Sequence, residues 1–170
     1  NKPLPLLFNG SFDHPLLNSG FDWEYTGPND HRAGARLDLQ PYRERGRVLR
    51  ITFDGRGFAN HVIRQHLILG PGAYTLEGQW WSQRLHSDQG LTWVVRCLGG
   101  RDTVSTELAR SAALMATGGQ WTRWQLAFEV PASGCGPGLE LSLRANATYE
   151  SRAGIQGEVL HDDIRLNYLP

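Results

Sequence analysis

Residues 160–167 (LHDDIRLN), near the end of the chain, contain a carboxylate whose expected position calls for a partner. Apolar and polar residues alternate there, which predicts a strand with one buried face. The alternation places Asp162 on the buried side and His161 on the solvent side. A buried carboxylate is costly unless it is paired, and no Lys or Arg lies nearby in sequence on that side. A bound cation or a set of backbone N–H donors would satisfy Asp162.

Residues 8–13 (FNGSFD) are a second short segment rich in oxygen ligands. We predict a strand here that meets the strand at 160–167. An acidic residue between two terminal strands suggests a closed β-sandwich whose two ends are fastened together.

The stretch around Trp81 combines the side chains that bind sugars. An aromatic ring can stack on the apolar face of a sugar, while amide, carboxylate and guanidinium groups bind its hydroxyls. Trp81 with Glu77, Gln79 and Arg84 supplies both kinds. In the loop at 16–34, Trp23 and Tyr25 could form a second aromatic platform. The alternatives are that Trp23 pins this loop to the sandwich and that Trp81 belongs to an edge strand or an interface.

Catalytic motifs are missing from the sequence. It has no G-x-S-x-G, H-E-x-x-H, P-loop or C-x-x-C pattern, and its six His residues lack metal-ligand spacing. Glu77 and Glu129 could face each other across a sheet, as glycoside hydrolysis requires of two carboxylates, but nothing marks them as a pair. We therefore expect a protein that is not an enzyme.

Short alternating segments separated by Gly and Pro turns predict an all-β sandwich of two antiparallel sheets. Residues 103–114 are ambiguous between a broken strand and a short helix. The expected strands cover 8–13, 35–39, 48–53, 60–69, 73–83, 91–98, 121–130, 139–145 and 160–167.

Length and charge restrict the function further. A chain of 170 residues suits a single domain, here 1–170. The formal net charge is zero, which argues against a nucleic-acid groove or a polybasic membrane surface. No apolar run is long enough to span a bilayer, and no signal-peptide pattern opens the chain. The first residue is not Met, which suggests a piece of a larger or processed protein.

The two cysteines favour an exported protein. Cys97 continues an inward-facing alternation, whereas Cys135 lies in a Gly/Pro loop. We favour a disulfide between them over two free thiols; it would stabilise the fold by about 4 kcal/mol in the chain-entropy model. A disulfide points to a secreted, periplasmic or cell-surface location.

The order of these segments resembles the carbohydrate-binding modules of families 4, 9 and 22, which are galactose-binding-like jelly rolls. The loop at 16–34 and the stretch at 109–119 match nothing in these families. The resemblance rests on Gln65 and on the segments NGSFD, PGAYTLEGQWW, WTRWQLAFEVP, LELSL and HDDIRL, in that order.

The resemblance implies a jelly roll that binds a polysaccharide or oligosaccharide without catalysis, as an accessory domain of a larger exported protein. It also implies one structural Ca²⁺ held at positions matching Ser11, Asp13 and Asp162, with backbone carbonyls completing the ligands. Without a metal, Asp162 would instead accept hydrogen bonds from turn amides. The alternative function is a structural or protein-interaction domain, because one fold serves many functions.

Overall fold

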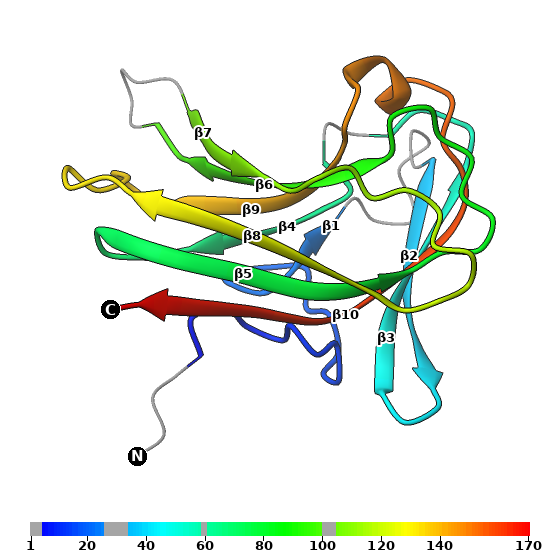
Figure 1. The fold of residues 1–170 in the computed structure, drawn as a ribbon, viewed down its shortest axis with the longest axis horizontal. Coiled ribbons are helices and arrows are strands. Elements are labelled where there is room, and N and C mark those ends of the chain that lie inside the picture. The colour runs from blue at the N-terminus through cyan, green and yellow to red at the C-terminus, as the bar shows by residue number, and fades with distance from the viewer. Residues whose placement is uncertain (1–4, 26–33, 59–60, 100–104) are drawn as a thin grey trace.

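The computed structural model describes residues 5–25, 34–58, 61–99 and 105–170. They form two five-stranded sheets in which every neighbouring pair of strands is antiparallel (Figure 1). Sheet A contains, in spatial order, β1 (Glu24–Tyr25), β4 (Ile63–Leu67), β9 (Leu139–Ala145), β6 (Leu91–Cys97) and β7 (Thr106–Arg110). Sheet B contains β2 (Ala35–Tyr42), β3 (Gly46–Asp54), β10 (Gln156–Leu169), β5 (Gly72–Trp81) and β8 (Thr122–Val130). The predicted all-β sandwich is confirmed.

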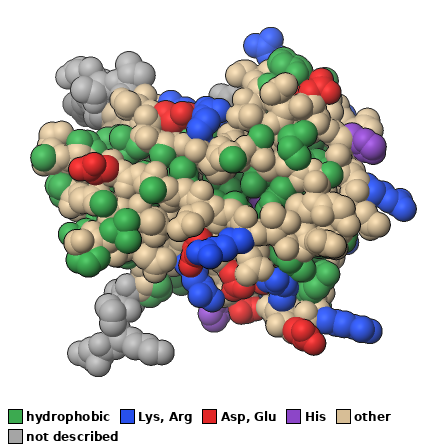
Figure 2. Space-filling model, viewed as in Figure 1, with side chains coloured by type: hydrophobic (Ala, Val, Ile, Leu, Met, Phe, Trp, Pro, Cys, Tyr) green, Lys and Arg blue, Asp and Glu red, His purple; other side chains and the backbone are tan. Residues whose placement is uncertain are grey.

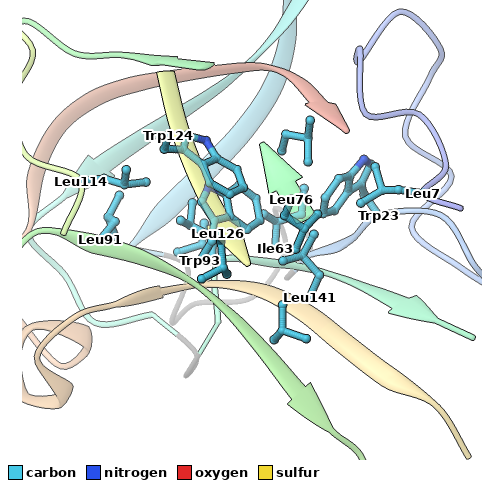
Figure 3. Close-up of a cluster of buried hydrophobic side chains, with 14 of the residues drawn as sticks. Leu7, Trp23, Ile63, Leu76, Leu91, Trp93, Leu114, Trp124, Leu126 and Leu141 are labelled. Atoms are coloured by element: carbon cyan, nitrogen blue, oxygen red, sulfur yellow. The ribbon is translucent and has the colours of Figure 1, made fainter. Parts of the chain in front are cut away.

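Alternation within the strands builds the core between the sheets. In β8 every second residue from Trp124 to Val130 is buried, and β5 follows the same rule. Trp23 and Trp93 are completely buried, and Trp93 stacks on Trp124 at 5.6 Å between ring centroids (Figure 3). These rings join the two sheets, because Trp93 belongs to β6 and Trp124 to β8.

The alternation predicted for the last strand is wrong on its N-terminal side. A β-bulge between Asp162 and Arg165 shifts the register, and Asp163 has a φ of 50°. Residues before the bulge therefore have the opposite orientation from the one expected. His161 faces the core and lies edge-on to Trp93, whereas Asp162 is on the outer face of sheet B, although it is only 2% exposed.

The N-terminal segment does contact the closing strand, but it is not itself a strand. Residues 8–13 form bends and turns, with Asn9 and Phe12 both at positive φ. The amide of Ile164 donates to the carbonyl of Gly10 at 2.9 Å. A side chain at Gly10 would place its Cβ only 1.9 Å from the Ile164 carbonyl oxygen, so glycine is required for this approach.

The remaining segments complete the sandwich. Cys97 and Cys135 are disulfide-bonded, as predicted, and tie the end of β6 to the β8–β9 connection. Within the ambiguous segment the described residues form β7 and no helix; residues 103–104 lie outside the description, as do 26–33. The described residues include one helical segment, the short 3-10 helix η1 (Thr148–Ser151). In that part of the chain no helix is long and apolar enough to cross a membrane.

Candidate binding site on the outer face of sheet B

The outer face of sheet B brings together three of the six predicted sugar-binding residues. Glu77, Gln79 and Trp81 project from alternate positions of β5 and are each partly exposed. In register beside them, β10 places Leu160 next to Trp81 and Asp162 next to Gln79, and β8 places Arg123 on the other side of Gln79. The predicted residues all lie on β5, and the surface around them is built from three strands, β10, β5 and β8.

Two adjoining hollows lie on this face. The first, of about 320 Å³, is lined by Glu77, Gly78, Gln79, Arg123, Asp163 and Arg165. The second, of about 510 Å³, is lined by Tyr42, Arg43, Glu44, Arg45, Gln79, Trp121, Asp162 and Asp163. They share Gln79 and Asp163, so we describe them together as the sheet B hollow. Figure 2 shows acidic and basic side chains gathered low in the middle of the face turned to the viewer.

Arg45 is the central charged group of the hollow. Its guanidinium lies 3.3 Å from Asp162 Oδ2 and 3.6 Å from Asp163 Oδ2, and it donates to Gln79 Oε1 at 2.5 Å. The same group stands over the Trp121 ring, with Cζ 3.9 Å from the ring centroid. This turn residue supplies the cationic partner of Asp162 that local sequence does not contain.

Burial raises the pKa of Asp162 to about 6, although hydrogen bonding to Arg45 acts in the opposite direction. Its Oδ2 faces Arg45, while its Oδ1 is buried and has no hydrogen-bond partner among the described residues. On the open side of the hollow, Arg123 forms an ion pair with Glu77. The amide nitrogen of Gln79 makes no hydrogen bond within the described part of the chain, so it can donate to a ligand hydroxyl.

Three side chains meet over the outer face of sheet B, and we call them the clasp: Tyr42, Arg45 and Trp121. Tyr42 ends β2 and Trp121 directly precedes β8, and these are the two edge strands of the sheet. The two rings nevertheless meet edge to face at 5.3 Å. Strong curvature explains this contact, because the β2–β3 hairpin stands almost upright against β5, β8 and the C-terminal part of β10 (Figure 1).

The predicted residues Trp81 and Arg84 lie outside the hollow. Trp81 is half-buried, and its ring lies 3.8 Å from where a Cβ on Gly119 would be. The backbone of the 117–119 segment bonds to Ser82, at the end of β5, which holds the segment beside Trp81. Arg84 is exposed after β5 and lines neither part of the sheet B hollow.

The second aromatic platform is only partly realised. The prediction for Trp23 is wrong, because its ring is fully buried, stacks on Phe12 and donates Nε1–H to the Asn9 carbonyl at 3.0 Å. This is the alternative in which Trp23 pins its loop to the core. Tyr25 is partly exposed and lines a different hollow, of about 430 Å³, beside β2 and β3.

The three predicted calcium ligands occupy different surroundings. Asp13 is exposed, and its Oδ1 accepts the amide N–H of Arg47 at 3.0 Å. Ser11 is half-buried, and Asp162 offers one unpartnered oxygen to a hard cation. Among the described residues no three His, Cys, Asp or Glu side chains group around one point, so other ligands would have to be carbonyls and water. Calcium stays a prediction.

The possible catalytic pair is not aligned in the sheet. Glu77 pairs in register with Gln125, whereas Glu129 pairs with Ala73, four residues along the strand. Four residues separate the backbone positions by roughly 13 Å, whereas glycoside hydrolysis uses two carboxyl groups about 5 to 9.5 Å apart.

Sequence reasoning missed much of the hollow. Trp121 could have been found, because it precedes a strand with Trp124 inward and so has the outward parity of Arg123 and Gln125. Arg45 gave no signal, since it lies in a turn far from β10 in sequence. Alternation places Asp163 and Arg165 on the solvent side, as observed, but it does not reveal the bulge that brings Asp162 to the same face.

No protein-family model matches the sequence, and no curated protein resembles it significantly. Solved structures do share its fold. A family 4 carbohydrate-binding module is 14% identical, with 96% of this chain and 99% of that one aligned at a TM-score of 0.67. The xylan-binding family 22 module of Paenibacillus barcinonensis Xyn10C is 17% identical, with 94% and 91% aligned at 0.61.

A third similar structure contains a module joined to an enzyme. The N-terminal family 22 and glycoside hydrolase family 10 modules of Clostridium thermocellum xylanase 10B, complexed with xylohexaose, align with 96% of this chain and 28% of theirs, at 12% identity and a TM-score of 0.60. At these identities the likeness establishes the fold, and the predicted jelly roll of the carbohydrate-binding modules is confirmed.

Proposed function

We propose that this chain is a non-catalytic carbohydrate-binding module that holds a polysaccharide or oligosaccharide in the sheet B hollow. The observation that carries the proposal is the placement of the Trp121 ring in one hollow with Gln79 and Asp163. A ring for stacking and polar groups for hydroxyls are the two components that sugar recognition needs. The fold supports the proposal, because the same sandwich is used by modules described as xylan-binding or complexed with xylohexaose.

The setting we propose is an accessory domain of a larger exported protein. The Cys97–Cys135 disulfide favours an oxidising compartment, which means a secreted, periplasmic or surface location. A similar module in C. thermocellum is joined to a glycoside hydrolase, which supports a parent protein with further domains.

Affinity electrophoresis in gels containing xylan, β-glucan or galactan tests the binding proposal. The wild-type protein should be retarded in at least one gel, and Trp121→Ala should weaken retention at least tenfold, or about 1.4 kcal/mol. Gln79→Ala should weaken it as well, because a hydroxyl partner is lost. Tyr149→Ala, which removes an exposed aromatic ring far from the hollow, is the matched control and should bind as wild type.

Circular dichroism must show that each variant is folded. If folded wild-type protein moves freely through every gel, the sugar-binding proposal is rejected. Retention that is equal in wild type and Trp121→Ala would leave sugar binding in place and would reject the sheet B hollow as its location.

A structural or protein-interaction domain is the second candidate, and one observation favours it. Several large apolar side chains are exposed near the ends of β4 and β10 and the N-terminal segment: Leu6, Phe8, Ile68, Tyr168 and Leu169. Tyr168 lies against Gly72, just after the turn that follows Ile68, so these parts share one end of the sandwich. Failure in every polysaccharide gel would favour this candidate.

A further inference from the structure

The clasp divides the outer face of sheet B instead of leaving it open from end to end. Tyr42 and Trp121 meet from opposite edges of the sheet, and the guanidinium of Arg45 stacks on the Trp121 ring. On the same face, Val48 and Leu160 are 0% and 1% exposed although both point outward by register. These two outward positions are therefore covered by other parts of the protein.

Along β5 the hollow ends between Gln79 and Trp81. Glu77 and Gln79 both line it, but Trp81, the next outward residue of the same strand, does not. Consecutive outward residues of a strand are about 7 Å apart. The cavity thus begins beside Glu77 and Arg165, continues past Gln79 and Asp163, and ends against Tyr42, Arg45 and Trp121.

A long glycan lying along β5 could not continue from the Glu77 side to the Trp81 side unless the Tyr42–Trp121 contact opened. Arg45 holds this contact in place, because its guanidinium forms ion pairs with Asp162 and Asp163 and donates a hydrogen bond to Gln79. The second hollow, of about 510 Å³, lies within the range of sites for small ligands. A volume of this size accommodates a few sugar units.

From this geometry we infer that the module binds the end of a glycan chain, or a short oligosaccharide, with the terminal sugar against the clasp, and that it does not bind the interior of a long chain. The inference rests on the proposed function and adds a substrate class to it. Trp121 and Tyr42 then act as an end wall, and Arg45 positions that wall.

Isothermal titration calorimetry with short and long forms of one glycan tests this inference. The probes are xylohexaose and a xylan of known mean length, with the corresponding β-glucan and galactan pairs. Chain-end binding gives one protein per chain for both the hexaose and the polymer. Several proteins per polymer chain would overturn the inference while leaving the proposed function intact.

A variant with an opened clasp, Tyr42→Ala together with Arg45→Ala, tests the physical cause. It should bind several copies along each polymer chain, because the end wall is removed. Arg47→Ala, on the same hairpin but outside the clasp, is the control and should keep one copy per chain. If the folded open-clasp protein still binds one copy per polymer chain, the clasp does not set the end of the site. Wild-type protein that binds no probe overturns the inference together with the proposed function.

Discussion

His161 and Asp162 are neighbours in β10, and burial changes their pKa values in opposite directions. Both are almost completely buried, so the neutral form of each is favoured. The pKa of His161 falls to about 3 and that of Asp162 rises to about 6. Only Asp162 has a charged partner, Arg45, among the described residues, whereas neither ring nitrogen of His161 has a hydrogen-bond partner there.

The lowered pKa of His161 predicts acid sensitivity. Between its folded pKa of about 3 and the usual unfolded value of 6.5, the unfolded state binds more protons, so stability falls as the pH falls through this window. At pH 5 the loss relative to neutral pH is about 2 kcal/mol. His161→Phe removes this titration and keeps a ring against Trp93.

Urea unfolding at pH 7 and pH 5 measures the effect. The stability difference between the two pH values should be about 2 kcal/mol smaller in His161→Phe than in wild type. Asp162 is present in both proteins, so its own titration largely cancels from the comparison. An identical pH dependence in the two proteins would show that His161 is not buried as described.

At the scale of elements, the N-terminal segment is held to sheet A by one side chain. Gln65 in β4 is 1% exposed and makes two bonds to Phe8: its Oε1 accepts the amide at 2.8 Å, and its Nε2 donates to the carbonyl at 2.9 Å. Gln65→Leu keeps the bulk but leaves both Phe8 backbone groups without these partners, at an expected loss of about 1 to 3 kcal/mol.

Hydrogen exchange is the measurement for Gln65→Leu. The Phe8 amide should exchange much faster in the variant, while amides of β5 and β8 at the far side of sheet B keep their protection. Unchanged protection at Phe8 would contradict the role given to Gln65.

The disulfide is the second fastening between elements. It closes a loop of 38 residues between the end of β6 and the β8–β9 connection. Replacing Cys97 and Cys135 by Ala should reduce the free energy of unfolding by about 4 kcal/mol in the chain-entropy model. Chemical denaturation of the double variant and of wild type, both without reductant, gives the value. A difference below 1 kcal/mol would mean that the crosslink adds little to this sandwich.

Strand positions were predictable where alternation is regular. The core faces of β5 and β8 follow directly from residues such as Tyr74, Leu76, Trp124 and Leu126. The N-terminal segment was misassigned, because alternation does not show that Asn9 and Phe12 adopt positive φ. The orientation predicted for the N-terminal part of β10 was wrong for a similar reason. The bulge inserts one residue, and the side chains before it therefore point to the opposite face from the one that alternation predicts.

At the scale of the whole molecule, the fold was easier to predict than the site. The fold depends on buried alternate residues spread over the entire chain, so single errors such as Trp23 do not change it. The hollow depends on a few contacts between distant segments, namely the β2–β3 hairpin, the bulge of β10 and the start of β8. Glu77 and Gln79 were predicted because they lie on one regular strand, whereas the curvature that brings Tyr42 to Trp121 has no local sequence signal.

The central claim is that a sugar occupies the sheet B hollow, and NMR titration with xylohexaose, cellohexaose and galactohexaose tests it most directly. The account predicts that at least one of these shifts the signals of the Trp121 indole N–H, the Gln79 side-chain amide and the Arg45 guanidinium, with little change on the outer face of sheet A around Arg64 and Glu140. Shifts confined to sheet A, or none with any of the three sugars, would contradict it.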